Sequence, residues 1–201
     1  VSVKLLSKIL VGGHCHPHQV IPAIVALSSS HSSKARAAAL DVLKTISETH
    51  STFLFSNFSV TLRSIYDLQS CYIHVQGFYE DRDVLKAWIS PLYEELCCKK
   101  SKREDFFTTI IREFLEYNQD AKYLVFITET LGTLPLKTQE EAVHLFRIVY
   151  ESALNSSSTI IESANGTDME MLRAFLLLAL RNHIGAAYNL TAEYTVKFHC
   201  S

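Results

Sequence analysis

Imidazole and thiol groups, which bind zinc and related metals, gather near the start of the chain. The segment His14-Cys15-His16-Pro17-His18 places three histidines and one cysteine within five residues, and Cys97-Cys98 is a pair of adjacent cysteines. Adjacent residues of an extended segment point to opposite faces, and adjacent cysteines are too close for ordinary chelation of one ion. No second cluster supplies the remaining ligands. The pattern therefore favours exposed histidines at the start of a helix, and we expect neither a metal site nor a cofactor.

Residues that could act as nucleophiles occur singly, outside the patterns that catalysis uses. The chain has no Gly-x-Ser-x-Gly turn, no glycine-rich phosphate loop and no His-Glu-x-x-His helix. Isolated cysteines and histidines can be paired on paper in many ways, so such pairs carry little weight. We predict that the chain is not an enzyme and has no catalytic residue; a helical enzyme domain is the least favoured alternative.

Basic residues offer a different chemistry, the binding of phosphate groups. Four of them form a dense run: Lys99, Lys100, Lys102 and Arg103. We predict that this run is a loop between two helices, where several cations can converge on one DNA backbone. Lys34 and Arg36, in the first turn of another predicted helix, are a weaker DNA-binding candidate. Because Glu104 and Asp105 partly neutralise the run, a solvated loop without a ligand is the alternative reading.

Composition limits the class of protein. The 201 residues are 48% hydrophobic and 20% charged with a net charge of −2, so a DNA contact must be a local patch rather than a general positive field. No apolar stretch approaches the roughly 20 residues that span a bilayer. Five cysteines, an odd number at irregular spacing, are typical of reduced thiols in a nuclear or cytosolic protein. Four N-glycosylation patterns, at Asn57, Asn155, Asn165 and Asn189, point the other way. The lack of an initiator Met at Val1 suggests a piece of a longer protein.

Helical periodicity runs through nearly the whole chain. The predicted helices cover about residues 5–11, 17–27, 34–46, 57–76, 83–99, 102–114, 121–132, 139–150 and 169–188. Capping boxes are predicted for Ser101 with Glu104 and for Thr138 with Glu141. Single N-caps are predicted at Ser32 or Ser33, Asp120 and Asp168. Only the short β-branched run 194–196 is consistent with extended backbone, so the pattern predicts an all-α fold.

The spacing of the helices favours a solenoid. Helix pairs of roughly 40 residues match HEAT and armadillo repeats, although no residue-level repeat is visible and a compact bundle is the alternative. The Ser-rich segment 155–167 is predicted to be a spacer between HEAT repeats in 1–154 and a terminal helix and tail in 168–201. The aromatics at helical core spacing are predicted to pack inside rather than to stack on bases. They are Trp88, Phe106, Phe107 and Phe114.

Three stretches, in order and spacing, resemble one known family. His16-Pro17-His18-Gln19-Val20-Ile21-Pro22 opens a helix similar to the His-Pro…Val-Pro helix of the Nipped-B-type cohesin loaders, and the small and basic Lys34-Ala35-Arg36 follows as in that family. The segment Leu136-Lys137-Thr138-Gln139-Glu140-Glu141 resembles the family's Tyr-Gln-Thr-Gln-Glu-Glu motif, with Leu136 in place of the aromatic. Residues 172–188 resemble its Leu-rich helix. The resemblance covers about residues 8–190.

The resemblance implies a fold and a function. The fold would be part of a hook-shaped HEAT-repeat α-solenoid, and the function would be to load cohesin onto chromatin in the nucleus. It also implies contacts with double-stranded DNA, with the Smc ATPase heads and with the kleisin, and stimulation of cohesin's ATPase without a nucleotide site of its own. The loader's tetratricopeptide subunit would bind an N-terminal region that is absent from this chain. The alternative is a HEAT-like adaptor in trafficking or transport that binds proteins and not DNA.

Overall fold

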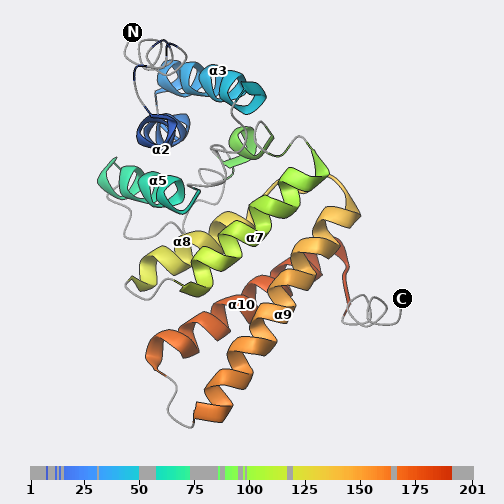
Figure 1. Cartoon of the computed structure of the whole chain (residues 1–201). Helices are drawn as coiled ribbons and strands as arrows, with labels where there is room; N and C mark the ends of the chain where they lie inside the picture. The colour runs from blue at the N-terminus through green and yellow to red at the C-terminus, as the bar shows by residue number, and fades with distance from the viewer. Residues whose placement is uncertain are drawn as a thin grey trace. The chain divides into compact units, whose positions relative to one another are not determined.

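A computed structural model describes residues 16–30, 32–49, 58–72, 89–94, 99–116, 120–163 and 167–191, with residues 8, 12, 14, 86 and 97. Throughout these residues regular structure is helical and no strand occurs (Figure 1). The helices are α2 (Pro17–Ser28), α3 (Ser33–Thr49), α5 (Phe58–Tyr72), α7 (Lys100–Glu116), α8 (Ala121–Gly132), α9 (Gln139–Ser163) and α10 (Asp168–Tyr188). The predicted all-α class is confirmed, while the solenoid arrangement stays a prediction.

Two compact units divide the chain, Val1–Thr109 and Ile110–Ser201. In the described part of the chain, no helix is long and apolar enough to cross a membrane. Of the first predicted helix only Lys8 is described, and it is helical, whereas Trp88 and the run 194–196 lie outside the described residues. In the predicted helix 83–99, residues 86 and 89–94 are helical.

In the first unit, α2 packs against both α3 and α5 (Figure 1). The apolar stripes of these helices supply fully buried side chains: Ile21, Ile24, Leu43, Ile46, Leu62 and Ile65. Buried Gln69 donates a hydrogen bond from Nε2 to the Ser29 carbonyl at 2.9 Å, which ties α5 to the end of α2. The α3 N-terminus is capped by Ser32, whose Oγ accepts from the Ala35 amide at 3.4 Å, as the sequence predicts.

An aromatic cluster completes this core and joins α5 to the first turns of α7. The rings of Phe58 and Phe106 meet edge to face with centroids 5.0 Å apart, and Tyr93 lies 5.5 Å from Phe106. Phe107 stacks on Tyr93 at 6.1 Å, and all four rings are buried. Phe106 and Phe107, together with buried Phe114, are therefore core residues as predicted. Such rings are not available for stacking on bases.

In the second unit, α10 packs against α9 and α8 (Figure 1). The three helices bury a set of large side chains: Tyr123, Leu124, Phe126, Ile127, Leu145, Phe146, Val149, Leu177, Leu180 and Ile184. Asp120 caps α8 as predicted, since its side chain accepts from the Lys122 amide at 2.9 Å. The prediction that α10 packs on two sides agrees with these two neighbours.

The predicted spacer is wrong over most of its length, because residues 155–163 are the last turns of α9. Serine hydroxyls there bond to the helix itself: Ser157 Oγ donates to the Ala153 carbonyl at 2.8 Å, and Ser158 Oγ donates to the Leu154 carbonyl at 3.0 Å. A polar, Ser-rich run can therefore stay helical because its hydroxyls are satisfied locally. Residues 164–166 lie outside the described residues, and the division into 1–154 and 168–201 stays a prediction.

Thr167, rather than Asp168, is the N-cap of α10. The Thr167 hydroxyl accepts from the Glu170 amide at 3.3 Å, and the Thr167 amide donates to Glu170 Oε2 at 2.7 Å, which completes a capping box. Asp168 is the first residue of the helix. The prediction missed by one residue because threonine and aspartate are both good caps, and only the glutamate three positions on distinguishes them.

Candidate nucleic-acid interface

The basic run forms the start of a helix, so its prediction as an interhelical loop is wrong. Helix α7 begins at Lys100, and the Arg103 amide donates to the Lys99 carbonyl at 3.1 Å. Ser101 is the second helical residue and therefore cannot be the N-cap of the predicted capping box with Glu104. Lysine and arginine are good helix formers, which explains why a highly charged stretch continues a helix rather than interrupting it.

The four cations fall into two pairs. Lys99 and Lys100 are exposed, whereas Lys102 and Arg103 are half-buried. Lys102 Nζ donates to the Ser47 carbonyl near the end of α3 at 3.5 Å, and Arg103 Nη1 donates to the Cys97 carbonyl at 3.1 Å. The half-buried pair bonds to carbonyls of its own unit, and the greater exposure of Lys99 and Lys100 places that pair better to reach a phosphate.

The electrostatics of this helix start favour an anion. The first turn of α7 contains no acidic residue, and its backbone N–H groups carry the positive end of the helix dipole. Cations are unfavourable at this end, by about 0.3–1 kcal/mol each at exposed positions. Glu104 and Asp105 follow directly and reduce the positive potential further along the helix. Lys99 and Lys100 therefore lie where positive charge costs stability and attracts anions.

The second candidate pair lies far from the first. Lys34 is exposed and Arg36 half-buried at the start of α3, whereas Lys102 meets the other end of that helix at Ser47. Thirteen residues of α-helix separate Lys34 from Ser47, a length of about 20 Å. The structure does not bring the two groups to one phosphate; about six base steps of a duplex would separate their contacts.

Charges of both signs lie on α3 between these ends. Asp41, Lys44 and Glu48 are all exposed on this helix. Because acidic residues alternate with lysine, α3 does not present a continuous basic stripe. Of the two candidates, the start of α7 therefore has the arrangement more favourable to a phosphate contact.

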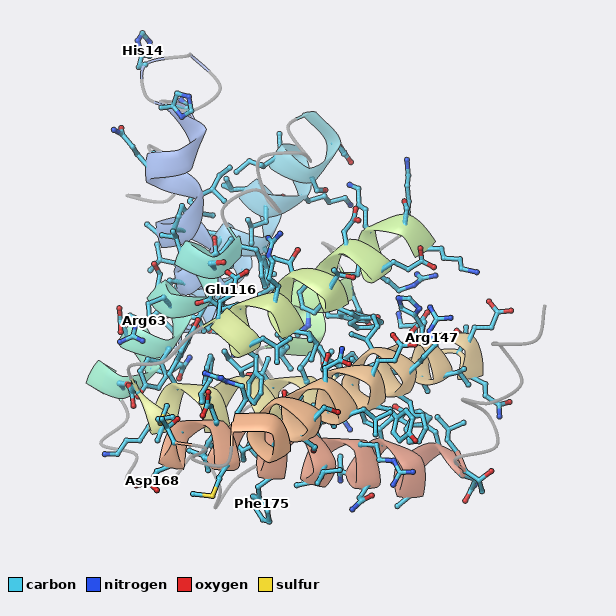
Figure 2. The ribbon with its side chains drawn as sticks, turned by 60° about the horizontal axis from the view of Figure 1, so that its bottom comes forward. His14, Arg63, Glu116, Arg147, Asp168 and Phe175 are labelled. Atoms are coloured by element: carbon cyan, nitrogen blue, oxygen red, sulfur yellow. The ribbon has the colours of Figure 1, made fainter. Side chains whose placement is uncertain are left out.

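The N-terminal histidines and the paired cysteines are the residues with metal-binding chemistry. His14 and His16 are exposed, and Figure 2 labels His14 on the segment before α2. Wherever the structure describes the chain, His, Cys, Asp and Glu do not form a group of three or more that could hold an ion. The side chains of Cys15, His18 and Cys98 lie outside the described residues.

Two features of the second unit escape sequence reasoning. The Arg181 guanidinium on α10 lies over the rings of Phe146 and Tyr150, 5.4 Å from each centroid, which makes it a packing element rather than a free surface charge. On the same helix Phe175 is 66% exposed, although periodicity alone would assign it to a core. The sequence did hold a signal for the exposure of Phe175, because α10 carries more apolar residues than two packed faces need.

Comparison with known proteins relates the chain to one family. The family model described as the sister chromatid cohesion C-terminus of Nipped-B proteins matches residues 1–150. The Nipped-B protein of Drosophila melanogaster is 24% identical over 157 residues, which are 72% of this chain and 7% of the relative. The Nipped-B-like protein B of Danio rerio is 22% identical over 168 residues, 81% of this chain and 6% of that relative. The chain thus spans less than a tenth of the length of these curated relatives.

Proposed function

Because the chain belongs to the Nipped-B family, within its sister chromatid cohesion C-terminal region, we propose that it is an interaction scaffold of a cohesin loader. The observation that carries this proposal is the family match over residues 1–150, which includes the described helices of the first unit. In this proposal the chain is part of a HEAT-type solenoid in the nucleus, acts on chromatin and has no catalytic site of its own.

The proposed partners are the cohesin complex and double-stranded DNA. Cohesin would be contacted through its Smc ATPase heads and its kleisin, and binding would promote loading and stimulate the ATPase. The tetratricopeptide subunit of the loader would bind outside these 201 residues. An all-helical fold supports a scaffold role, since packed helices present long rigid surfaces to large partners.

The proposed DNA contact is centred on Lys99 and Lys100. Both are exposed, and they stand at a helix start where the first turn contains no acidic residue. Lys102 and Arg103 would act mainly by holding this turn through the carbonyls of Ser47 and Cys97. Lys34 and Arg36 would add a second, separate contact.

The test replaces Lys99→Glu and Lys100→Glu together in the full-length loader. Lysines bind duplex DNA chiefly by releasing condensed counterions, so affinity should fall on unrelated sequences alike. The slope of log affinity against log salt should fall by about 0.9 for each lost phosphate contact. The melting temperature should not fall, because acidic residues are favourable at a helix N-terminus.

The matched control replaces two other exposed lysines, Lys44→Glu and Lys122→Glu, with the same change in net charge. Lys122 also lies in the first turn of a helix, so the control reproduces that setting. The control should leave the salt slope close to that of the unmodified loader. A salt slope in the Lys99/Lys100 variant equal to that of the unmodified loader would contradict the DNA contact. If the slope were equal but stimulation of the ATPase were lost, the two lysines would bind an acidic protein partner instead.

A further inference from the structure

A serine hydroxyl lies in the middle of the basic run at the start of α7. Ser101 has Lys99 and Lys100 directly before it and Lys102 and Arg103 directly after it. Ser101 is exposed, as are Lys99 and Lys100, whereas Lys102 and Arg103 are half-buried. The hydroxyl therefore belongs to the part of the run that a second protein can reach from solvent.

The charges around Ser101 are those of a substrate for a protein kinase that selects basic segments. Such a kinase binds its substrate in an acidic groove, so cations on both sides of the acceptor hydroxyl strengthen the complex and carboxylates weaken it. The four residues before Ser101 contain no aspartate or glutamate, and the first carboxylate after it is Glu104. Ser101 thus has the cations that this groove requires immediately next to it.

The position of Ser101 in its helix lets a kinase reach the backbone as well. A kinase binds the acceptor segment in an extended form, so the first turn of α7 has to open. Ser101 is the second residue of α7, and helix ends open at a much lower free-energy cost than helix centres. The opening has to release the Lys102 bond to the Ser47 carbonyl, which is 3.5 Å long, and the Arg103 bond to the Cys97 carbonyl.

A phosphate on Ser101 changes the charge of this helix start more than its fold. Phosphoserine carries a charge of about −1.5 to −2 at pH 7, enough to offset both Lys99 and Lys100. These lysines are one and two residues away, within the Debye length of about 8 Å at 0.15 M ionic strength. The helix dipole favours an anion here, and repulsion from Glu104, three residues further on, opposes this preference by a similar amount.

We propose that Ser101 is a phosphorylation site and that its phosphate switches off the DNA contact at the start of α7. The kinase transfers the γ-phosphoryl group of ATP to Ser101 Oγ. The Oγ–P bond forms, the bond from the γ-phosphorus to the β–γ bridging oxygen breaks, and ADP leaves with that electron pair. The hydroxyl proton passes to the catalytic base of the kinase. This inference rests on the proposed DNA contact of Lys99 and Lys100.

The first arm of the test measures whether Ser101 is a substrate. The full-length loader is incubated with ATP and the catalytic domain of a kinase that selects basic segments, and phosphopeptides are mapped by mass spectrometry. Thr167 is the matched internal control, because it is exposed at the start of a helix but is followed by Asp168 and Glu170. We expect modification at Ser101 and none at Thr167. No modification at Ser101, or equal modification of both residues, overturns the proposal.

The second arm measures the effect on DNA binding. Phosphoserine is incorporated at position 101 of the full-length loader during translation, and affinity for duplex DNA is measured against salt concentration. The slope of log affinity against log salt should fall by up to about 1.8, which is about 0.9 for each of two lost phosphate contacts. Affinity at 0.15 M salt should fall roughly tenfold or more. Phosphoserine at position 158, an exposed serine of the other unit, is the charge-matched control and should leave the slope unchanged.

The Lys99→Glu/Lys100→Glu loader is titrated beside these proteins, so that failure of the switch can be told from failure of the DNA contact. If the lysine variant lowers the slope and phosphoserine at 101 does not, the switch is wrong and the DNA contact stands. If neither lowers the slope, the DNA contact is wrong and the switch falls with it. An equal loss from phosphoserine at 158 overturns the switch, because net charge rather than this position would then act. A lower melting temperature of the loader with phosphoserine at 101 overturns it too, because the phosphate would then disrupt the helix.

Discussion

At the scale of single residues, capping groups show how a side chain acquires its role from its neighbours. Glu141 donates its amide to Thr138 Oγ1 at 3.2 Å, but its carboxylate accepts from the Lys137 amide at 2.9 Å rather than from Thr138. Glu170 completes the reciprocal pattern with Thr167. Identical Thr-x-x-Glu sequences thus bind different backbone amides, depending on the path of the chain before the helix.

The pKa of Glu170 predicts a dependence of stability on pH. The Thr167 backbone amide, followed by its hydroxyl, lowers the pKa of this carboxyl below its ordinary value. The charged form is therefore favoured in the folded state, and its contribution to stability is present above the unfolded pKa of about 4.3 and is lost as pH falls through the folded pKa. Glu170→Gln keeps an acceptor for the amide but does not ionise, so it should lose less stability between about pH 5 and pH 3. Thermal unfolding across this range measures the difference.

A control for this prediction is Glu104→Gln, at another glutamate early in a helix but without the cap. This variant should lose as much stability between about pH 5 and pH 3 as the unmodified chain does. Equal acid sensitivity in the Glu170→Gln variant and in the unmodified chain would show that the cap does not contribute through its charge.

At the scale of elements, α9 shows that local hydrogen bonds, rather than composition, determine where a helix ends. Its last turns are polar and Ser-rich, but residues 155–163 follow the helix that begins at Gln139. Ser157 and Ser158 direct their hydroxyls to carbonyls of the preceding turn. The helix therefore continues beyond the last strongly apolar turn.

Substitution of exposed Ser158 tests this extension of α9. In a helix, Ser158→Ala should leave stability unchanged or raise it by up to about 0.5 kcal/mol. Ser158→Pro should cost about 3 kcal/mol or more, because proline removes an amide donor and clashes with the preceding turn. Urea unfolding of the two variants provides the comparison. If proline were tolerated as well as alanine, this stretch would be a linker after all.

Helix α10 offers a second comparison between adjacent leucines. Leu177 is 1% exposed and packs within its unit, whereas Leu178, the next residue of the same helix, is 44% exposed. In the 201-residue chain, Leu177→Ala should destabilise by about 2–5 kcal/mol because it removes buried methyl groups and leaves a cavity. Leu178→Ala should stay within about 0.5 kcal/mol. Equal effects in denaturant unfolding would contradict the exposed position of Leu178 on α10.

At the scale of the whole molecule, the chain divides into two compact units, each with its own buried side chains. Leu43 is fully buried in the first unit and Leu177 is nearly so in the second. Regions with separate cores open with separate free energies. Leu43→Ala should therefore speed amide hydrogen exchange mainly in α2, α3 and α5, and Leu177→Ala mainly in α8, α9 and α10. Exchange measured by mass spectrometry reports both sets, and uniform acceleration by either variant would contradict independent units.

Much of the local structure was determined by the sequence itself. The helix at Pro17–Ser28, the cap at Asp120 and the helix ending at Tyr188 follow from apolar spacing and capping residues. These features depend on contacts and hydrogen bonds within about four residues, which a single sequence displays directly. The resemblance to Nipped-B proteins likewise depends only on the order and spacing of motifs along the chain, and it agrees with the family match.

Only the tertiary structure decided which side chains of those helices stay exposed and therefore available to bind a partner. Phe106 and Phe175 have the same chemistry and both fit a helical apolar pattern, yet one is fully buried and the other is 66% exposed. Lys99 and Lys102 belong to one basic run, but only Lys102 meets the Ser47 carbonyl, 55 residues earlier in the chain. Burial and long-range hydrogen bonds depend on which elements become neighbours in space, and local periodicity contains no information about that choice.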